Sequence, residues 1–384
     1  MLCFSHDWSG DPLSKTHLMR LLARDNRVLW VNSIGYRTPS ASRQDARRTL
    51  RKLAAAAAPL RQPLPNLFVL NPLIIPAHGS AAIRRFNGWA LRLQVRRAMR
   101  TLRMRRPINW VFNPAAALVA GALDEDLLIY YCVDEYAALS GVCPEHLRSL
   151  EQELLTNAHV VVVSSERLRQ SKGVLRPDAL LVRHGVDWNH FRQALVPGTS
   201  VPPDLARLPR PVLGYFGLLS RDWVDVDLIA HAARSLPDTT LALIGRQTMD
   251  LSALRGLPNV HLLGHRPYES LPGYCKGFDA AMIPFPISEV TLNANPLKAR
   301  EYLAAGLPVI STDIPEARVL PHVRLATTRD EFVAHARAAL AQPGPNPLVS
   351  DAVRDQSWES RLAQFCSHIH RVAAGRPSAL RAAA

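Results

Sequence analysis

Short apolar runs alternate with longer amphipathic stretches along nearly the whole chain. In the first half, the apolar runs fall at residues 2–5, 27–32, 67–70, 109–112, 127–132 and 160–164. The stretches with helical spacing of apolar residues include 14–24, 81–106 and 144–158. Nearly continuous apolar strands separated by helices are typical of a parallel sheet that is covered on both faces.

The same alternation starts again after a proline-rich segment, residues 193–211, which holds five prolines. Further apolar runs follow at 212–217, 240–245, 259–264, 279–285 and 307–312, and an amphipathic helix is expected at 357–374. The pattern predicts an α/β protein with two doubly wound domains, 1–192 and 212–356, joined by a linker at 193–211. Because parallel sheets bind ligands beyond the carboxyl ends of their strands, a ligand is expected in the cleft between the domains.

Composition excludes several classes of protein. The 384 residues are 48% hydrophobic and 20% charged, which is typical of a globular chain. No apolar run approaches the ~18 residues of a membrane span, and the start lacks the basic and apolar regions of a secretory signal. The five cysteines form no C-x-x-C pair, which argues against a disulfide framework or a zinc site and favours the cytoplasm.

The charge is strongly basic and unevenly distributed. Lys and Arg number 46 against 32 Asp and Glu, a net charge of +14, and residues 1–180 hold 25 basic and 14 acidic residues. This excess indicates an anionic partner, namely nucleic acid, anionic lipid or a phosphorylated substrate, unless arginine serves only solubility.

Segment 81–106 holds nine arginines and no acidic residue. Its helical spacing places Arg85, Arg92, Arg96 and Arg103 on one face, and Ile83, Phe86, Ala90 and Leu93 on another. It is therefore either a membrane-surface helix or a helix that packs on the core.

The most informative block is 284–312, whose order is strand, polar loop, helix, glycine turn and strand. Pro296 fits the first helical turn, and Asn293 or Asn295 can cap the helix. The free N–H groups there suit a phosphate, which Lys298 could also reach. Glu301 lies on the same face and could accept hydrogen bonds from a ribose diol. An ordinary capped helix with a solvated Lys–Glu pair explains the same residues.

The segment N-P-L-K-A-R-E-Y-L-A-A-G-L-P-V-I (295–310) closely resembles the donor-site segment of GT-B glycosyltransferases of the group 1, family-4-like set. Further resemblances follow the family order, at residues 183–187, 212–222, 257–272 and 357–361. The resemblance implies two Rossmann-like domains, with a helix at 357–374 that packs back on the first. It also implies a nucleotide-sugar donor, taken to be UDP-linked, and no bound metal or other cofactor. The residues that it implies for donor binding are Gly217, Arg221, His265, Arg266, Asn295, Lys298 and Glu301.

One departure concerns the mechanism. Retaining members often carry E-x7-E, whose second glutamate matches Glu301, but the first position here is Asn293. Residues 5–8 and 131–135 more closely resemble the xanthan-type glucuronosyltransferase and the teichuronic-acid-type enzymes. That resemblance implies inversion with Asp134 as the base. His6 and Asp7, which also follow a strand, are rival bases or acceptor ligands.

These features together predict transfer of a sugar to a hydroxyl group of a lipid-linked saccharide in bacterial surface-polysaccharide synthesis. Arg85, Arg92 and Arg96 would then face an anionic membrane, and the enzyme would be cytoplasmic and peripheral to the inner face of the membrane. His17 either contacts the acceptor or packs, and packing is favoured.

Three alternatives stay open: a retaining transferase, a nucleotide-sugar 2-epimerase of the same fold, and a nucleic-acid-binding protein. The last is opposed by the interleaved acidic residues of the second domain and by the lack of a clustered aromatic and basic motif.

Overall fold

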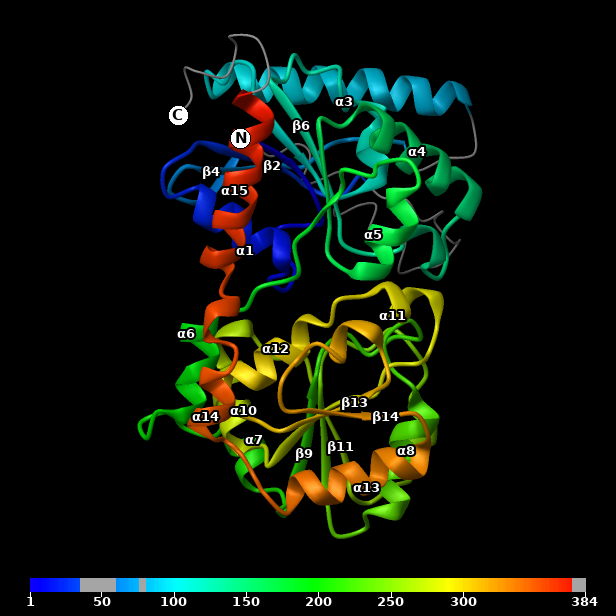
Figure 1. The fold of residues 1–384 in the computed structure, drawn as a ribbon, viewed down its shortest axis with the longest axis vertical. Coiled ribbons are helices and arrows are strands. Elements are labelled where there is room, and N and C mark those ends of the chain that lie inside the picture. Colours follow the sequence, from blue (N-terminus) through cyan, green and yellow to red (C-terminus); the bar gives the residue numbers. More distant parts are fainter. Residues whose placement is uncertain (35–59, 76–80, 375–384) are drawn as a thin grey trace. The chain divides into compact units, whose positions relative to one another are not determined.

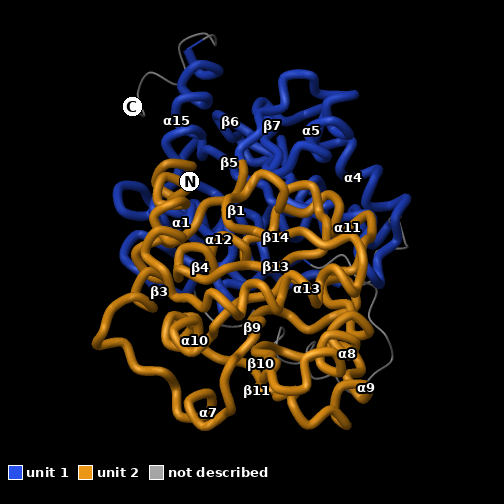
Figure 2. Tube along the Cα trace, turned by 60° about the horizontal axis from the view of Figure 1, so that its bottom comes forward, with its two compact units in different colours: residues 1–182, 362–384 blue, residues 183–361 orange. Residues whose placement is uncertain are grey.

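The computed structural model describes residues 1–34, 60–75 and 81–374. The chain forms two compact units, coloured separately in Figure 2. Unit 1 comprises Met1–Val182 together with Leu362–Ala384, and unit 2 comprises Arg183–Arg361. Each unit is built around one sheet (Figure 1).

The sheet of unit 1 has eight strands in the order β3-β4-β2-β1-β5-β6-β7-β8. Only the edge strand β3 runs antiparallel to its neighbour. The strands are β1 (Leu2–Phe4), β2 (Val28–Val31), β3 (Arg61–Leu64), β4 (Leu67–Leu70), β5 (Ile108–Val111), β6 (Leu127–Cys132), β7 (Val160–Val163) and β8 (Leu180–Leu181).

The central strands of unit 1 are buried on both faces. Every residue of β1, β2, β6 and β7 is buried, which is possible only when helices and loops cover both sides of the sheet. The longer helices of unit 1 are α1 (Ser14–Leu22), α3 (Ala81–Thr101), α4 (Pro144–Asn157) and α5 (Glu166–Gly173).

The sheet of unit 2 has six strands, all parallel, in the order β11-β10-β9-β12-β13-β14. They are β9 (Val212–Phe216), β10 (Thr240–Ile244), β11 (Val260–Gly264), β12 (Ala280–Ile283), β13 (Val309–Thr312) and β14 (Val323–Ala326). Its helices of five or more residues are α8 (Val226–Ser235), α10 (Leu271–Gly277), α11 (Glu289–Asn293), α12 (Leu297–Ala304), α13 (Arg329–Leu340) and α14 (Pro347–Asp351).

The core of unit 2 lies on both faces of this sheet. Along β9, Val212 and Phe216 belong to one buried cluster, whereas Leu213 and Tyr215 belong to another. Because successive side chains of a strand point to opposite faces, the two clusters lie on opposite sides of the sheet. The predicted fold class, with two parallel α/β sheets, is therefore confirmed.

The expected linker at 193–211 is part of unit 2. The chain passes from unit 1 to unit 2 at Val182 and Arg183, before the proline-rich segment. Within that segment, α7 (Pro203–Ala206) buries Leu205 in the core of unit 2. The prolines therefore mark a segment packed against α10, not a free connection.

The last helix, α15 (Trp358–Ala374), spans the second passage between the units. Trp358 is buried in unit 2, whereas Phe365 packs edge-on against Trp110 and Tyr131 of unit 1. The helix therefore contributes to both cores.

Candidate active site

Glycines end three neighbouring strands of unit 2. Gly217 follows β9, Gly245 follows β10, and Gly264 ends β11. The N–H of Gly217 donates to the carbonyl of Ile244 at 2.9 Å, and the N–H of Gly245 donates to the carbonyl of Gly264 at 2.9 Å. A Cβ at Gly245 would lie 1.7 Å from the Gly217 carbonyl oxygen, so only glycine fits there. Sequence reasoning selected Gly217 but missed Gly245, although a glycine directly after an apolar run was the visible signal.

Lys298 and Glu301 meet on α12. Lys298 Nζ lies 3.0 Å from Glu301 Oε2, and it also lies 5.1 Å from the centre of the Phe216 ring at the end of β9. The Glu301 side chain is 1% exposed. Apart from this ion pair, its Oε2 accepts no hydrogen bond from the described residues. The pair is therefore not a solvated surface pair, and the buried carboxylate retains capacity to accept hydrogen bonds.

The N-terminus of α12 has no side-chain cap. Pro296 is the N-cap residue and accepts no hydrogen bond with its side chain, so the expected asparagine cap is wrong. The Asn293 side chain instead donates to the carbonyl of Glu289 at 2.7 Å, within the preceding helix. Pro296 therefore supplies no side-chain cap to the first N–H groups of α12, where an anion would be stabilised.

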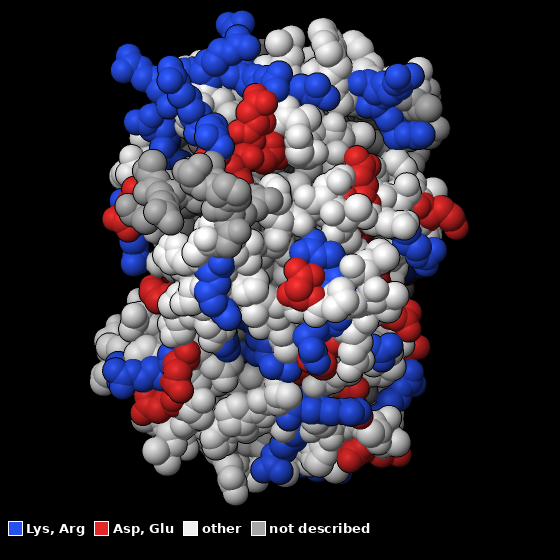
Figure 3. Space-filling view, turned by 45° about the horizontal axis from the view of Figure 1, so that its top comes forward, with Lys and Arg blue, Asp and Glu red and all other residues white. Residues whose placement is uncertain are grey.

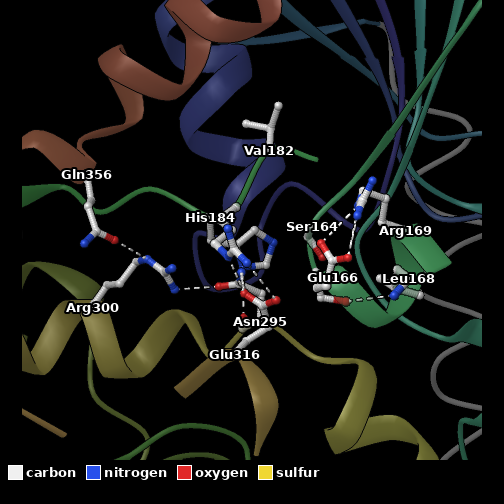
Figure 4. A network of polar contacts seen from close by, with 12 residues as sticks. Ser164, Glu166, Leu168, Arg169, Val182, His184, Asn295, Arg300, Glu316 and Gln356 are labelled. Atoms are coloured by element: carbon white, nitrogen blue, oxygen red, sulfur yellow. Dashed lines mark hydrogen bonds and ion pairs between the residues drawn. The ribbon is translucent and has the colours of Figure 1, made fainter. Parts of the chain in front are cut away.

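Asn295 lies inside a buried polar network of unit 2 (Figure 4). Its Oδ1 accepts from Arg300 Nη1 at 2.5 Å, and its Nδ2 donates to Glu316 Oε2 at 3.0 Å. Arg183 forms an ion pair with Glu316 at 2.7 Å, and His184 Nδ1 lies 3.0 Å from the Asn295 carbonyl oxygen. Because both polar atoms of the Asn295 side chain are used, its role is to hold the loop before α12. Sequence reasoning missed Glu316, which no motif marked.

The other expected donor residues lie in loops of unit 2. Arg266 forms an ion pair with Asp204 at 2.6 Å and donates to Tyr274 Oη at 2.7 Å, so its guanidinium already holds two parts of the unit together. Arg221, after β9, and His265, after β11, are exposed. The structure thus brings Lys298, Glu301 and the end of β9 together, and it assigns Arg266 an internal role.

In unit 1, Asp134 follows the buried strand β6. It is partly exposed, and burial raises the pKa of its carboxyl group, against the opposing effect of the nearby Lys15. The next residue, Glu135, forms an ion pair with Lys172 at 2.7 Å, and Lys172 also pairs with Glu151 at 2.8 Å. These buried ion pairs fix the turn that carries Asp134. Sequence reasoning did not select Lys15 or Lys172.

The rival bases, His6 and Asp7, both form polar contacts within unit 1. His6 Nδ1 lies 3.0 Å from Ser5 Oγ, and burial, together with the charge of Lys15, lowers the pKa of His6 to about 3. Asp7 Oδ1 accepts from the backbone N–H of Ser33 at 3.1 Å. His17 is buried in α1, as packing requires.

Helix α3 presents its apolar stripe outward. Phe86, Trp89 and Leu93 are 49%, 60% and 51% exposed. The alternative in which this face packs on the core is therefore wrong for Phe86 and Leu93. The core-facing side is instead formed by Leu91, Val95 and Ala98, one helical face away.

The arginines of α3 flank this outward stripe. Arg85 and Arg92 are exposed, whereas Arg96 forms an ion pair with Asp124 at 3.0 Å. Arg103, expected on the same face, lies beyond the end of the helix at Thr101. Figure 3 shows Lys and Arg side chains gathered at the α3 end of unit 1.

Comparison with known proteins gives the chain its class. Residues 210–342 match the family model described as glycosyl transferases group 1. Over 286 residues, the chain is 26% identical to the putative teichuronic acid biosynthesis glycosyltransferase TuaH of Bacillus subtilis (strain 168), covering 67% of this chain and 70% of TuaH. The chain is a glycosyltransferase of the GT-B fold.

Solved structures share the fold of this glycosyltransferase over nearly its whole length. Sucrose-phosphate synthase from Thermosynechococcus elongatus superposes with a TM-score of 0.70 at 15% identity, covering 98% of this chain and 99% of that one. Anabaena Alr3699/HepE in complex with UDP-glucose superposes with a TM-score of 0.65 at 15% identity, covering 96% and 99%. The resemblance expected from the sequence is confirmed.

Proposed function

We propose that this glycosyltransferase transfers a sugar from a UDP-sugar to a hydroxyl group of a lipid-linked saccharide in bacterial surface-polysaccharide synthesis. The observation that carries the donor assignment is the buried Glu301 carboxylate, with its unfilled acceptor capacity, paired to Lys298 beside an uncapped helix N-terminus. Alr3699/HepE has been solved with UDP-glucose, and TuaH is described as a teichuronic acid enzyme, which supports the donor class and the type of product.

Each donor-binding group has a chemical task. A diphosphate leaving group develops negative charge, which the Lys298 ammonium and the first N–H groups of α12 would stabilise. Glu301 would accept hydrogen bonds from the ribose hydroxyls. Because these groups supply the positive charge themselves, we propose that transfer needs no metal ion or other cofactor, so activity should persist in EDTA.

We assign the acceptor to unit 1 and propose inversion with Asp134 as the base. A general base must be ionised before the reaction and must take up a proton during it. A carboxylate of raised pKa accepts that proton more readily than an ordinary carboxylate. Neutral His6 is a much weaker base. A retaining transfer remains the alternative, although Asn293 stands where a retaining enzyme of the family-4-like set carries glutamate.

Titration of the full chain with UDP tests the donor site. Lys298→Ala and Glu301→Gln should each weaken binding about 10- to 150-fold, because a hydrogen bond to a charged group contributes about 1.5–3 kcal/mol. Lys276→Ala is the matched control, because Lys276 donates only to the carbonyls of Val196 and Pro197 at the surface. Unchanged UDP affinity in both site variants would refute the assignment.

A lipid-linked acceptor requires that the enzyme reach the bilayer. No described helix is long and apolar enough to cross a membrane. The exposed apolar stripe of α3, flanked by Arg85 and Arg92, is the composition expected of a helix lying in an anionic interface. We therefore propose peripheral association with the cytoplasmic face of the membrane through α3.

A further inference from the structure

Asn295, which lies just before Pro296 and the start of α12, is held through three of its polar atoms (Figure 4). Its Oδ1 accepts from Arg300 Nη1 at 2.5 Å, and its Nδ2 donates to Glu316 Oε2 at 3.0 Å. Its carbonyl oxygen lies 3.0 Å from His184 Nδ1. Asn295 is buried, so water cannot replace these partners. Side chains from three segments of unit 2 therefore fix the turn before α12.

Two of these side chains are charges in the interior of unit 2. Arg300 is 1% exposed and Glu316 is 2% exposed. Removing a charge from water is costly, and buried ionic groups often stabilise a fold no more than apolar side chains of the same size. Stability therefore does not explain why charges occupy these positions. A buried polar network does select one arrangement, because any other arrangement leaves a charge without its partners.

The network also includes residues from both passages between the units. Arg183, the first residue of unit 2, pairs with Glu316 at 2.7 Å. Gln356, shortly before α15, accepts from Arg300 Nε at 2.9 Å. These two segments also bond to each other, because the N–H of Val186 donates to the carbonyl of Gln356 at 2.9 Å. The turn before α12 is thus tied, through two charged side chains, to backbone that is itself fixed.

The backbone at Asn295 sets the direction of the first N–H groups of α12. Pro296, the N-cap residue, has no N–H group, and its carbonyl accepts from the N–H of Ala299 at 3.2 Å. The N–H groups of Leu297 and Lys298 precede this bond and point out of the helix end. Such donors stabilise a charge best when they are held in place before it develops. A fixed Asn295 therefore prepares the helix start for an anion.

We propose that Arg300 and Glu316 are positioning residues of the donor site, which act through Asn295 to hold the start of α12 for the diphosphate of the nucleotide sugar. This inference rests on the proposed function, because it requires that α12 bind that diphosphate. In this role neither residue needs to touch the donor. When the network is broken, the diphosphate loses aligned donors, whereas the nucleoside keeps its contacts with Glu301.

Titrations of the full chain with UDP and with uridine test this role, because only UDP carries the diphosphate. Glu316→Gln and Arg300→Met should each weaken UDP binding about tenfold or more, since aligned charge-assisted bonds to the diphosphate are lost. The uridine affinity should stay within about twofold of the parent value. Unchanged UDP affinity would overturn the proposal. Equal losses for UDP and uridine would also overturn it, because a purely structural role disturbs the whole site.

Combination with Asn295→Ala shows whether the two charged residues act through Asn295. Asn295→Ala alone should weaken UDP binding to a similar extent. Adding Glu316→Gln should then change the UDP affinity by no more than about twofold, because the connection is already broken. Losses that multiply in the double variant would show an independent effect of Glu316 and would contradict the proposal.

Asp279→Asn is the matched control. Asp279 is also a buried carboxylate of unit 2, which pairs with Arg210 and accepts from the N–H of Val212 at 2.6 Å. It precedes β12 and so lies at the amino edge of the parallel sheet, opposite to the strand ends that carry Gly217. Its substitution should lower the melting temperature and leave the UDP affinity unchanged. A UDP loss equal to that of the network variants would show that affinity merely follows stability, which would overturn the proposal.

Gln356→Met is a milder variant, which keeps the test decisive if the charged residues prove necessary for folding. It removes an uncharged, partly exposed acceptor of Arg300. UDP binding should weaken about threefold, with uridine affinity unchanged. A folded Gln356→Met protein with the UDP affinity of the parent would contradict the proposal.

Lys298→Ala separates this inference from the donor assignment on which it rests. If Lys298→Ala weakens UDP binding and the network variants do not, the positioning role is wrong and the donor assignment stands. If Lys298→Ala and Glu301→Gln both leave the UDP affinity unchanged, the donor assignment is wrong, and the positioning role falls with it.

Discussion

Glu301 and Asp134 show how the surroundings of a carboxylate determine what it can do. Glu301 is almost fully buried and sits 3.0 Å from a lysine, so it is suited to accept hydrogen bonds as an anion. Asp134 is partly exposed and forms no ion pair among the described residues. Burial raises the pKa of its carboxyl group, which the nearby charge of Lys15 opposes. The first is suited to binding and the second to proton transfer.

Asp134→Asn should reduce turnover by about 10²–10⁴, the usual contribution of general acid–base catalysis, and should leave UDP affinity unchanged. The removed carboxylate must be ionised to accept a proton. In the parent enzyme, activity should therefore fall as pH drops through the raised pKa of Asp134, at a pH above the ordinary value of 3.8. Rates measured across pH on the parent and the variant check both points. A variant that keeps full turnover, or a parent whose rate shows no fall at any pH above 3.8, would exclude Asp134 as the base.

Single residues were predictable where a motif or a strand end marked them. Lys298 and Glu301 stand in a recognisable segment, and Asp134 ends an apolar run. Lys15, Lys172 and Glu316 could not be selected, because what distinguishes them is burial beside groups distant in the sequence. Asn295 shows that a motif can also mislead. It belongs to the recognisable segment, but its side chain bonds Glu316 and Arg300 within the fold.

At the scale of elements, α3 is the clearest case of a helix whose existence was predictable and whose orientation was not. Its length and arginine content follow from the sequence. Two apolar sets compete for the core, and the set with Leu91, Val95 and Ala98 is the buried one. Phe86, Trp89 and Leu93 remain exposed, and because both sets contain leucine, only tertiary packing could decide which set is buried.

Replacing Arg85 and Arg92 by glutamine should weaken binding to anionic vesicles about 30-fold, because each arginine near such a surface contributes about 1 kcal/mol. A separate variant, Phe86→Ser with Trp89→Ser and Leu93→Ser, should lose the binding that persists at high salt. Co-sedimentation with vesicles of phosphatidylglycerol and phosphatidylcholine, over a salt series, measures both.

The matched control for charge is Arg318→Gln with Arg329→Gln, two exposed arginines of unit 2. This variant should sediment like the parent. If the control and the α3 variants bind the vesicles equally well, α3 is not the membrane contact. The same follows if the parent binds neither phosphatidylglycerol nor phosphatidylcholine vesicles.

At the scale of the whole molecule, the two parallel sheets follow from the alternation of apolar runs and helices, and the strand pairing agrees with it. The edge strands β3 and β14 were not predicted, because every residue of β3 is exposed and the exposed Arg324 interrupts the apolar residues of β14. The boundary was misplaced for a related reason. Prolines at 193–211 are typical of a linker, but buried Leu205 ties that segment to unit 2.

The stereochemistry of the product distinguishes an inverting transfer from a retaining one. An inverting transfer should give a glycoside whose anomeric configuration is opposite to that of the donor sugar, which proton NMR of the first product determines. A retained anomer would exclude Asp134 as an inverting base and establish the retaining alternative. Incubation of the enzyme with UDP-sugar alone should leave the sugar configuration intact, whereas a changed C2 centre would identify an epimerase.

The split membership of α15 has a consequence for how the chain folds during synthesis. Unit 2 is one continuous segment, 183–361, inserted before the last part of unit 1. Phe365, which packs on Trp110 and Tyr131, leaves the ribosome after all of unit 2. Unit 2 can therefore form its core first. Until Phe365 is made, Trp110 and Tyr131 in the sheet of unit 1 lack the side chain that finally packs on them. The nascent chain is thus most exposed to chaperone binding and aggregation in its oldest half, the reverse of the usual N-to-C order of domain maturation.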